Sequence, residues 1–381
     1  MVAGCASPGF PPGGPEDKAA PKIVSISPES GSVNAAPRSV TVRFDEVVNE
    51  RPGAAPDLSG IVLISPRDGT PRVDWRRTAI SIRPRRRWKA NTVYSVTVLP
   101  GISDLRGNTT KQGATVIFST GPTIPRTRVS GVVFDWVAGR PAGRAAVEVI
   151  PPSDTTNVYV TQADSLGRFS LEALPPSEYR IRAYLDPNNN RALDPREAWD
   201  TVRVALTDTA NAELYTFVHD TNPPRVSNVE VRDSITLRVT FDKPLDPGTA
   251  LDTTMFRLRG ADSVDIPVLL VREAREWEKA RADSAELRDS LARPAGDSIP
   301  FPVRRQPADT AQVETPPGLN RRTPISEVVI QVYPPLKAGQ SYRLRALGAR
   351  GLLGAGGTSQ RVFALPKAAT PRVPAPPPPP P

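Results

Sequence analysis

The chain is poor in the side chains on which most enzyme and metal sites depend. Its 381 residues include one cysteine, one histidine and two methionines. A single cysteine cannot form a disulfide within the chain, and one histidine with one cysteine excludes the usual zinc ligand sets. Catalysis by a nucleophile and an imidazole would depend on His219, in a stretch typical of a linker between domains. We therefore predict that the protein is not an enzyme.

Aromatic residues and long apolar runs are also scarce. Aromatic residues make up 6% of the chain and hydrophobic residues 38%. No apolar run approaches the ~20 residues that a membrane-spanning helix needs. Proline, in contrast, accounts for 45 of the 381 residues, which favours short strands and turns over long helices. The composition predicts an all-β protein.

The charge balance is only modestly basic. The sequence has 49 basic and 40 acidic residues, for a formal net charge of +9. The densest basic run is at residues 83–89 (RPRRRWK). It could bind nucleic acid or an anionic glycan, but no nucleic-acid-binding motif accompanies it. We interpret the run as a solvated turn between strands and predict no nucleic-acid partner.

Two pairs of matching segments indicate an internal repeat. Residues 40–46 (VTVRFDE) and 237–243 (LRVTFDK) both alternate apolar and polar residues and then reach an acidic turn. Further along, residues 88–94 (WKANTVY) match residues 336–342 (LKAGQSY) with the same spacing from the large apolar residue to the tyrosine. The chain therefore contains two copies of one β-rich module.

The second copy carries an insertion, because the distance between its two motifs is about twice that in the first copy. Residues 272–291 within it are rich in helix formers and have an imperfect apolar stripe. Residues 294–324 follow as a proline- and charge-rich loop, predicted to be disordered in part. We expect one helix, either docking a partner or lying solvated on its own domain, and favour the second.

The first copy contains a set of short motifs at residues 26–28 (ISP), 40–45 (VTVRFD), 94–98 (YSVTV), 104–108 (DLRGN) and 118–120 (FST). Together these motifs resemble the bacterial Ig-like domain of S-layer proteins. The resemblance implies a β-sandwich, which short alternating strands between Gly, Pro, Asn and Asp turns also predict. Asp104 and Asn108 could face a ligand, but a turn stabilised by its own Asx side chains explains them and is favoured.

The second copy departs from this pattern, since residues 349–354 (ARGLLG) stand where the DLRGN turn is expected. The segment between the copies differs from both. Its motifs are residues 129–135 (VSGVVFD), 164–176 (DSLGRFSLEALPP) and 179–184 (YRIRAY). Together they resemble a carboxypeptidase regulatory-like domain. That family has a transthyretin-type (prealbumin-like) seven-stranded sandwich and serves as an accessory fold, so the resemblance implies no active site.

One segment has the spacing of a metal-binding loop. Residues 186–197 (DPNNNRALDPRE) place oxygen ligands as in the calcium loop of an EF-hand. Arg191 takes the position that requires glycine in such a loop, and a strand rather than a helix is predicted before it. A long turn held by Asx side chains and prolines explains the same residues. Both interpretations stay open, and the candidate calcium ligands are Asp186, Asn188, Asn190, the Ala192 carbonyl, Asp194 and Glu197.

Cys5 follows small residues and precedes a Gly/Pro/Ser-rich run, which resembles a bacterial lipobox and its tether. A secretory signal peptide needs a charged region and 7–15 apolar residues before its cleavage site, so this interpretation places the start of the signal upstream of Met1. The alternative is an ordinary terminal thiol. The resemblance implies lipidation of Cys5 and attachment to a membrane through the lipid, and Ala6 after the cysteine favours the outer membrane.

The sequence thus predicts an all-β chain of three tandem β-sandwich domains, Ig-like, transthyretin-like and Ig-like, with one inserted helix and disordered termini. The predicted function is a non-catalytic cell-envelope lipoprotein at the periplasmic or outer surface, a scaffold that binds an envelope protein or a carbohydrate. A calcium-dependent binding module that uses the 186–197 loop is the alternative, and an envelope hydrolase the third. The predicted segments are 1–20 (tether), 21–122, 127–219, 223–366 with an insertion at about 272–324, and 367–381 (proline-rich tail).

Overall fold

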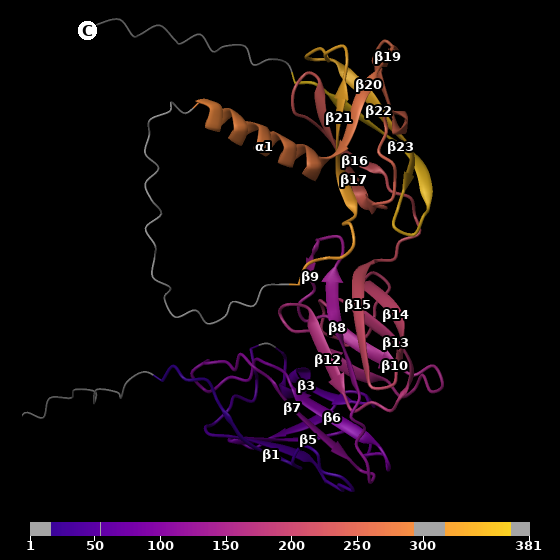
Figure 1. The fold of residues 1–381 in the computed structure, drawn as a ribbon. Coiled ribbons are helices and arrows are strands. Elements are labelled where there is room, and N and C mark those ends of the chain that lie inside the picture. Colours follow the sequence, from indigo (N-terminus) through magenta and orange to yellow (C-terminus); the bar gives the residue numbers. More distant parts are fainter. Residues whose placement is uncertain (1–16, 54, 293–316, 367–381) are drawn as a thin grey trace, which may run out of the picture. The chain divides into compact units, whose positions relative to one another are not determined.

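The computed structural model describes residues 17–53, 55–292 and 317–366 (Figure 1). Predictions about Cys5, the tail at 367–381 and most of the loop at 294–324 fall outside these residues. Within them, the structure consists of β-strands with one long helix, as predicted. The described part of the chain contains no helix that is both long and apolar enough to cross a membrane.

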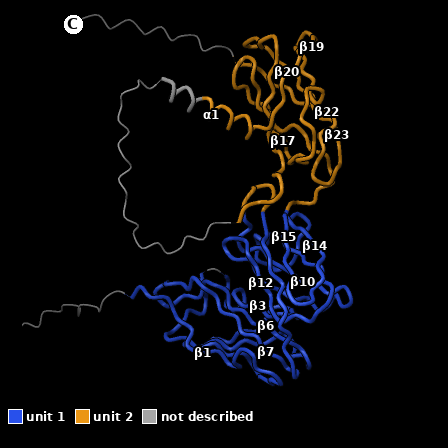
Figure 2. Tube along the Cα trace, viewed as in Figure 1, with its two compact units in different colours: residues 1–134, 141–216 blue, residues 135–140, 217–381 orange. Residues whose placement is uncertain are grey.

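The chain forms two compact units (Figure 2). One contains residues 1–134 and 141–216, and the other contains residues 135–140 and 217–381. The first two predicted domains therefore share one unit, and the short segment 135–140 belongs with the other unit. The predicted domain boundaries themselves stay predictions.

The first β-sandwich has a four-stranded and a three-stranded sheet. Apolar side chains alternate along its strands and meet between the sheets, where Phe118 is fully buried. Trp88 and Tyr94 pack on it, with Trp88 edge-on to both rings at centroid distances of 4.7 Å to Tyr94 and 5.3 Å to Phe118. The sheet orders are β1 (Ile23–Ser27), β2 (Val40–Phe44), β5 (Ala79–Arg83), β4 (Arg72–Trp75), and β3 (Val62–Ser65), β6 (Val93–Val98), β7 (Ala114–Ser119).

In the middle sandwich, hydrogen bonds join the strands in one continuous path. The hairpin of β14 and β15 is long enough, at 9 and 10 residues, to belong to both layers. Gly167 has φ +73°, in keeping with its predicted role in a tight turn. The order is β11 (Tyr159–Gln162), β10 (Ala146–Ile150), β13 (Ser177–Tyr184), β14 (Ala198–Leu206), β15 (Thr209–Val218), β8 (Arg128–Asp135), β12 (Arg168–Glu172), with β9 (Arg140–Pro141) on β8.

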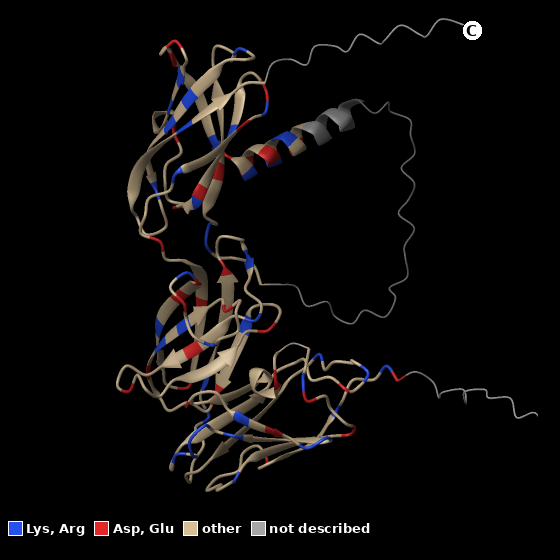
Figure 3. Ribbon diagram, turned by 180° about the vertical axis from the view of Figure 1, so that it is seen from behind, with Lys and Arg blue, Asp and Glu red and all other residues tan. Residues whose placement is uncertain are grey.

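The last sandwich has two four-stranded sheets around a continuous apolar core. The predicted helix is confirmed as α1 (Ala274–Ala292), which follows β20 directly. Basic and acidic residues are interspersed along its first turns (Figure 3). The sheet orders are β16 (Val226–Val231), β17 (Thr236–Leu245), β21 (Ile325–Val332), β20 (Val268–Glu273), and β19 (Asp265–Ile266), β18 (Phe256–Gly260), β22 (Ser341–Arg350), β23 (Gly356–Ala364).

The internal repeat is visible in individual hydrogen bonds. In the first copy, Lys22 N donates to Asp45 Oδ1 at 2.7 Å and Asp45 N donates to Lys22 O at 3.0 Å. In the last sandwich, Arg225 N donates to Asp242 Oδ1 at 2.7 Å and Asp242 N to Arg225 O at 2.9 Å. The aspartate after each repeated strand therefore performs the same task, fixing the chain that enters the first strand.

The second repeated motif also has the same contact in both copies. The backbone N–H of Lys89 donates to the hydroxyl of Tyr94 at 2.7 Å. The N–H of Lys337 donates to the hydroxyl of Tyr342 at the same distance. Each tyrosine thus buries its ring in the core and satisfies a turn N–H at its rim, which explains why the spacing recurs.

Candidate functional site

The predicted metal-binding loop is the connection between β13 and β14 in the middle sandwich. Strands flank it on both sides, so it lacks the helices of an EF-hand, as the sequence indicated. Its first residue, Asp186, accepts hydrogen bonds from the N–H groups of Asn190 at 3.1 Å and Arg191 at 2.8 Å. Asn190 Oδ1 in turn accepts from Ala192 N at 2.8 Å. These Asx contacts hold the loop in a tight curl.

The two asparagine side chains bridge to the second aspartate. Asn188 Nδ2 and Asn190 Nδ2 both donate to Asp194 Oδ2, at 2.8 Å and 3.0 Å. The side-chain oxygens of the same two asparagines accept hydrogen bonds from backbone N–H groups of the loop. The three predicted ligands Asn188, Asn190 and Asp194 therefore lie together.

The last residue of the loop is the most unusual. Glu197 is only 8% exposed. Its Oε2 accepts from Asp194 N at 3.0 Å, but its Oε1 is buried and has no hydrogen-bond partner among the described residues. A buried carboxylate oxygen without a partner costs free energy. This oxygen is therefore a position that a cation or a donor would satisfy.

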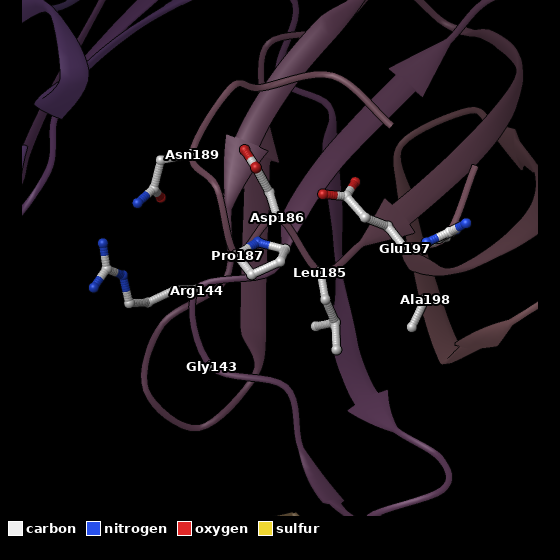
Figure 4. A pocket seen from close by; sticks show the side chains of 9 residues that line it. Gly143, Arg144, Leu185, Asp186, Pro187, Asn189, Glu197 and Ala198 are labelled. Carbon is white, nitrogen blue, oxygen red and sulfur yellow. The ribbon is translucent and has the colours of Figure 1, made fainter. Parts of the chain in front are cut away.

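A pocket of about 450 Å³ lies beside the loop. Asp186 and Glu197, at the two ends of the loop, are both among the residues that line this pocket (Figure 4). Arg144 and Arg196 also line it. The pocket therefore combines both signs of charge, with the acidic groups coming from the loop.

Arg191, which the sequence marks as a defect in a calcium loop, has a structural role. Its φ is +59°, the left-handed conformation that the loop requires and that favours glycine. Its guanidinium leaves the loop and donates to Gly60 O at 2.6 Å and Val62 O at 2.9 Å in the first sandwich. Burial of the guanidinium lowers the pKa of Arg191. The residue thus connects the loop to the neighbouring sandwich within the same compact unit.

Arg67 of the first sandwich makes a further contact with this loop. Its Nη1 donates to Arg191 O at 3.0 Å and lies 3.0 Å from Glu148 Oε1. Glu148 is 1% exposed, and its Oε2 also accepts from Arg182 Nε at 3.0 Å and from Arg182 Nη2. We call Arg67, Glu148, Arg182 and Arg191 the arginine junction.

Backbone groups extend the junction. Arg67 N donates to Val158 O at 2.7 Å, and Val160 N donates to Ser65 Oγ at 3.0 Å. Sequence reasoning missed these contacts entirely. The one signal was Glu148, a charged residue in the otherwise apolar segment 146–150 (AVEVI), because such a residue needs a buried partner.

A groove of about 990 Å³ runs along the first two sandwiches in this unit. Its walls combine apolar side chains with threonine, serine and charged side chains from both sandwiches. The charged residues that line it are Lys111, Arg128, Arg144, Asp164, Arg168, Glu172, Asp186 and Arg191. Basic residues outnumber acidic ones in this set, although Arg128 pairs with Glu172 at 3.0 Å.

A second acidic group lies in the first sandwich. Carboxylate oxygens of Asp17, Glu46 and Asp104 lie within 4.8 Å of one another. Asp104 is satisfied by its own turn, since its Oδ1 accepts from Arg106 N and Asn108 N, each at 2.8 Å. The predicted interpretation of Asp104 and Asn108 as a turn agrees with these contacts. Burial and the neighbouring Asp104 raise the pKa of Glu46.

His219 packs on the aromatic ring of Phe217 with a centroid distance of 4.1 Å. Its Nδ1 lies 3.1 Å from the Phe217 carbonyl oxygen. One ring nitrogen of the only histidine therefore contacts the backbone at the end of β15.

Comparisons with known proteins match part of the chain. No curated protein matched the sequence. Among solved structures, the N-terminal part of the bacterial S-layer protein SbsC is 15% identical, with a TM-score of 0.21 over 37% of this chain and 24% of that one. An L,D-transpeptidase from Mycobacterium smegmatis is 16% identical, with a TM-score of 0.20 over 49% of this chain and 74% of that one. The chain therefore spans about a quarter of the S-layer fragment.

A further structure, the S-layer protein SbsC with domains 1–6, is 9% identical and has a TM-score of 0.21 over 92% of this chain and 55% of that one. The sequence model of the bacterial Ig-like domain family matches residues 17–120. These residues form the first β-sandwich, so the comparison and the sequence motifs point to the same segment as a bacterial Ig-like domain.

Proposed function

We propose that the protein is a non-catalytic component of the bacterial cell envelope, whose β-sandwiches form a scaffold that presents a glycan-binding groove. The Ig-like match at residues 17–120 supports a structural role at the cell surface. The observation that carries the proposal is the arginine junction, which ties two sandwiches into one unit. Domains within a chain move relative to one another unless their interface is strong, and buried charged contacts oppose such motion.

The assignment of the middle sandwich to the transthyretin-like accessory fold belongs to this proposal. Its motif at residues 164–176 supports that assignment, and an accessory fold suits a scaffold. The engagement of His219 with the Phe217 carbonyl is compatible with a non-catalytic protein, because an imidazole base must be placed against its nucleophile.

The groove suggests which ligands the scaffold takes. Its basic side chains, among them Lys111 and Arg144, favour an acidic polysaccharide of the envelope. Serine and threonine hydroxyls in the walls offer both donors and acceptors to sugar hydroxyl groups. A protein ligand for the same groove would be the alternative outcome of the test below.

The double variant Lys111→Ala, Arg144→Ala tests the groove. Removing two basic side chains is expected to weaken binding of acidic envelope polysaccharide to the full chain at least about fivefold, because each charge contributes on the order of 0.5–1 kcal/mol at such a surface. Affinity electrophoresis in polysaccharide gels measures the change. The matched control is Arg180→Ala, Arg203→Ala, two exposed arginines paired across β13 and β14. If polysaccharide retards both double variants equally, or does not retard the parent protein, the groove does not bind glycan.

Lipid attachment at Cys5 is the second part of the proposal, and cells that express the complete gene can test it. A clickable palmitate analogue is expected to label the parent and to leave Cys5→Ser unlabelled, since the thiol is the acceptor. Fractionation should move the Cys5→Ser protein from the membrane to the soluble envelope fraction. Labelling of both proteins would show that Cys5 is not the lipid acceptor.

A further inference from the structure

We propose that the 186–197 loop binds one Ca²⁺ ion and that the bound ion stabilises the arginine junction through Arg191. This proposal rests on the proposed scaffold function in one respect, because it makes the arginine junction the part of the scaffold that calcium regulates. Calcium binding itself can be measured without any glycan or partner.

The first support is the chemistry of the loop. Ca²⁺ takes six to eight oxygen ligands at about 2.3–2.6 Å. These groups all lie in one turn between two strands, but the carboxylate oxygens of Asp186, Asp194 and Glu197 do not all lie within 4.8 Å of one another, so a bound ion would have to draw the loop together. The ligands would be the side-chain oxygens of Asp186, Asn188, Asn190, Asp194 and Glu197, with the Ala192 carbonyl.

The second support is independent of the spacing. Glu197 Oε1 is buried without a hydrogen-bond partner among the described residues, and its side chain lines the same pocket as Asp186. Leaving a carboxylate oxygen in this state is costly. A divalent cation that contacted Glu197 Oε1 would remove that cost, and Glu197 is the residue that the spacing of the loop assigns as the last ligand.

The loop is only partly organised for the ion. Asp186 is fixed by two N–H groups, whereas Asn188 and Asn190 direct their amide N–H groups to Asp194 Oδ2. On binding, Asp194 would exchange these donors for the cation, and the amide oxygens would turn toward it. Arg144 and Arg196 in the pocket oppose a positive ion. We therefore expect a Kd of about 10⁻⁴–10⁻³ M, the range of extracellular calcium modules.

Arg191 connects the ion to the junction, because each of its polar groups takes part. Its N–H donates to Asp186, its carbonyl accepts from Arg67, and its guanidinium donates to Gly60 and Val62. An ion that fixes Asp186 also fixes the backbone from which this side chain extends. By linkage, an intact junction must strengthen calcium binding as much as calcium strengthens the junction.

Calorimetric titration of Ca²⁺ into the EDTA-treated full chain tests the site. One binding event is expected, with a rise in Tm of roughly 3–6 °C at a calcium concentration tenfold above Kd. Glu197→Gln and Asp186→Asn should each weaken binding at least about tenfold, because each removes a charged ligand. Glu178→Gln is the matched control, an exposed acid on β13 outside the loop, and should leave the titration unchanged.

A further variant separates the loop from the other acidic group. Glu46→Gln alters the group formed by Asp17, Glu46 and Asp104, and should leave calcium binding unchanged. If Glu46→Gln abolishes the heat and Glu197→Gln does not, the ion binds in the first sandwich and the proposal is wrong. Absence of heat and of thermal shift at 10 mM calcium would overturn it as well.

Hydrogen exchange tests the coupling. The amides of Arg67 and Val160 donate across the junction, to Val158 O and Ser65 Oγ. Calcium should slow their exchange at least about threefold in the parent and leave it unchanged in Arg191→Ala, which keeps every proposed ligand. Protection confined to the loop would refute the coupling. Retained calcium heat with no polysaccharide binding would contradict the scaffold proposal alone.

Discussion

Replacing Glu148 with alanine is expected to lower the free energy of unfolding of the first compact unit by about 2–4 kcal/mol. The Glu148 side chain is 2% exposed and pairs with Arg67 and Arg182, whose side chains are 32% and 30% exposed. Removing one partner of a buried pair typically costs about 3–5 kcal/mol, because the remaining charge is left unpaired. Partial hydration of the two arginines reduces this range. Urea-induced unfolding followed by tryptophan fluorescence measures the loss.

Glu172→Ala is the matched control for this prediction. Glu172 pairs with Arg128 at 3.0 Å, but the two side chains are 50% and 56% exposed. The loss is therefore expected to stay below about 1 kcal/mol, as for other surface ion pairs. Glu148→Gln should fall between the two, since it keeps an acceptor and loses the charge. Equal effects of Glu148→Ala and Glu172→Ala would show that the junction adds no stability.

Features determined by neighbouring residues were predictable from the sequence. The alternation of apolar residues placed strands such as β2 and β6, and helix-forming composition placed α1 close to its observed limits. The repeat extended even to backbone conformation, because Asn91 and Gly339, at matching positions, have φ +49° and +77°. Asparagine and glycine are the residues that adopt this conformation most readily.

The arginine junction could not be predicted because its partners are far apart in sequence. Arg67 and Arg191 are separated by 124 positions, and Arg191 and Gly60 by 131. The local sequence pattern around an arginine does not indicate whether its side chain is exposed or buried. The sequence therefore indicated the loop and its oxygen ligands, but treated Arg191 as a mismatch when its side chain in fact determines where the loop lies.

Stability of the first unit is expected to fall steeply above pH 10. Burial raises the pKa of the hydroxyl groups of Tyr94, Tyr159, Tyr179 and Tyr184 above their usual value near 10. In the unfolded chain these groups ionise near pH 10, while in the folded unit they stay protonated. The folded state then binds more protons, so the stability present below pH 10 is lost as pH rises toward the folded pKa values. Each tyrosine that stays protonated in the folded unit contributes about 1.4 kcal/mol per pH unit.

Tyr179→Phe distinguishes this effect from general alkaline denaturation. Tyr179 is 2% exposed and donates its hydroxyl to Pro175 O at 2.7 Å, so the variant should lose about 1 kcal/mol at pH 8. Between pH 10 and pH 11.5 its stability should fall less steeply than that of the parent, by about 1.4 kcal/mol per pH unit, because one linked group is gone. Urea unfolding at half-unit pH intervals gives both slopes. An unchanged slope would mean that Tyr179 ionises at the same pH folded and unfolded, and that the alkaline loss arises from other groups.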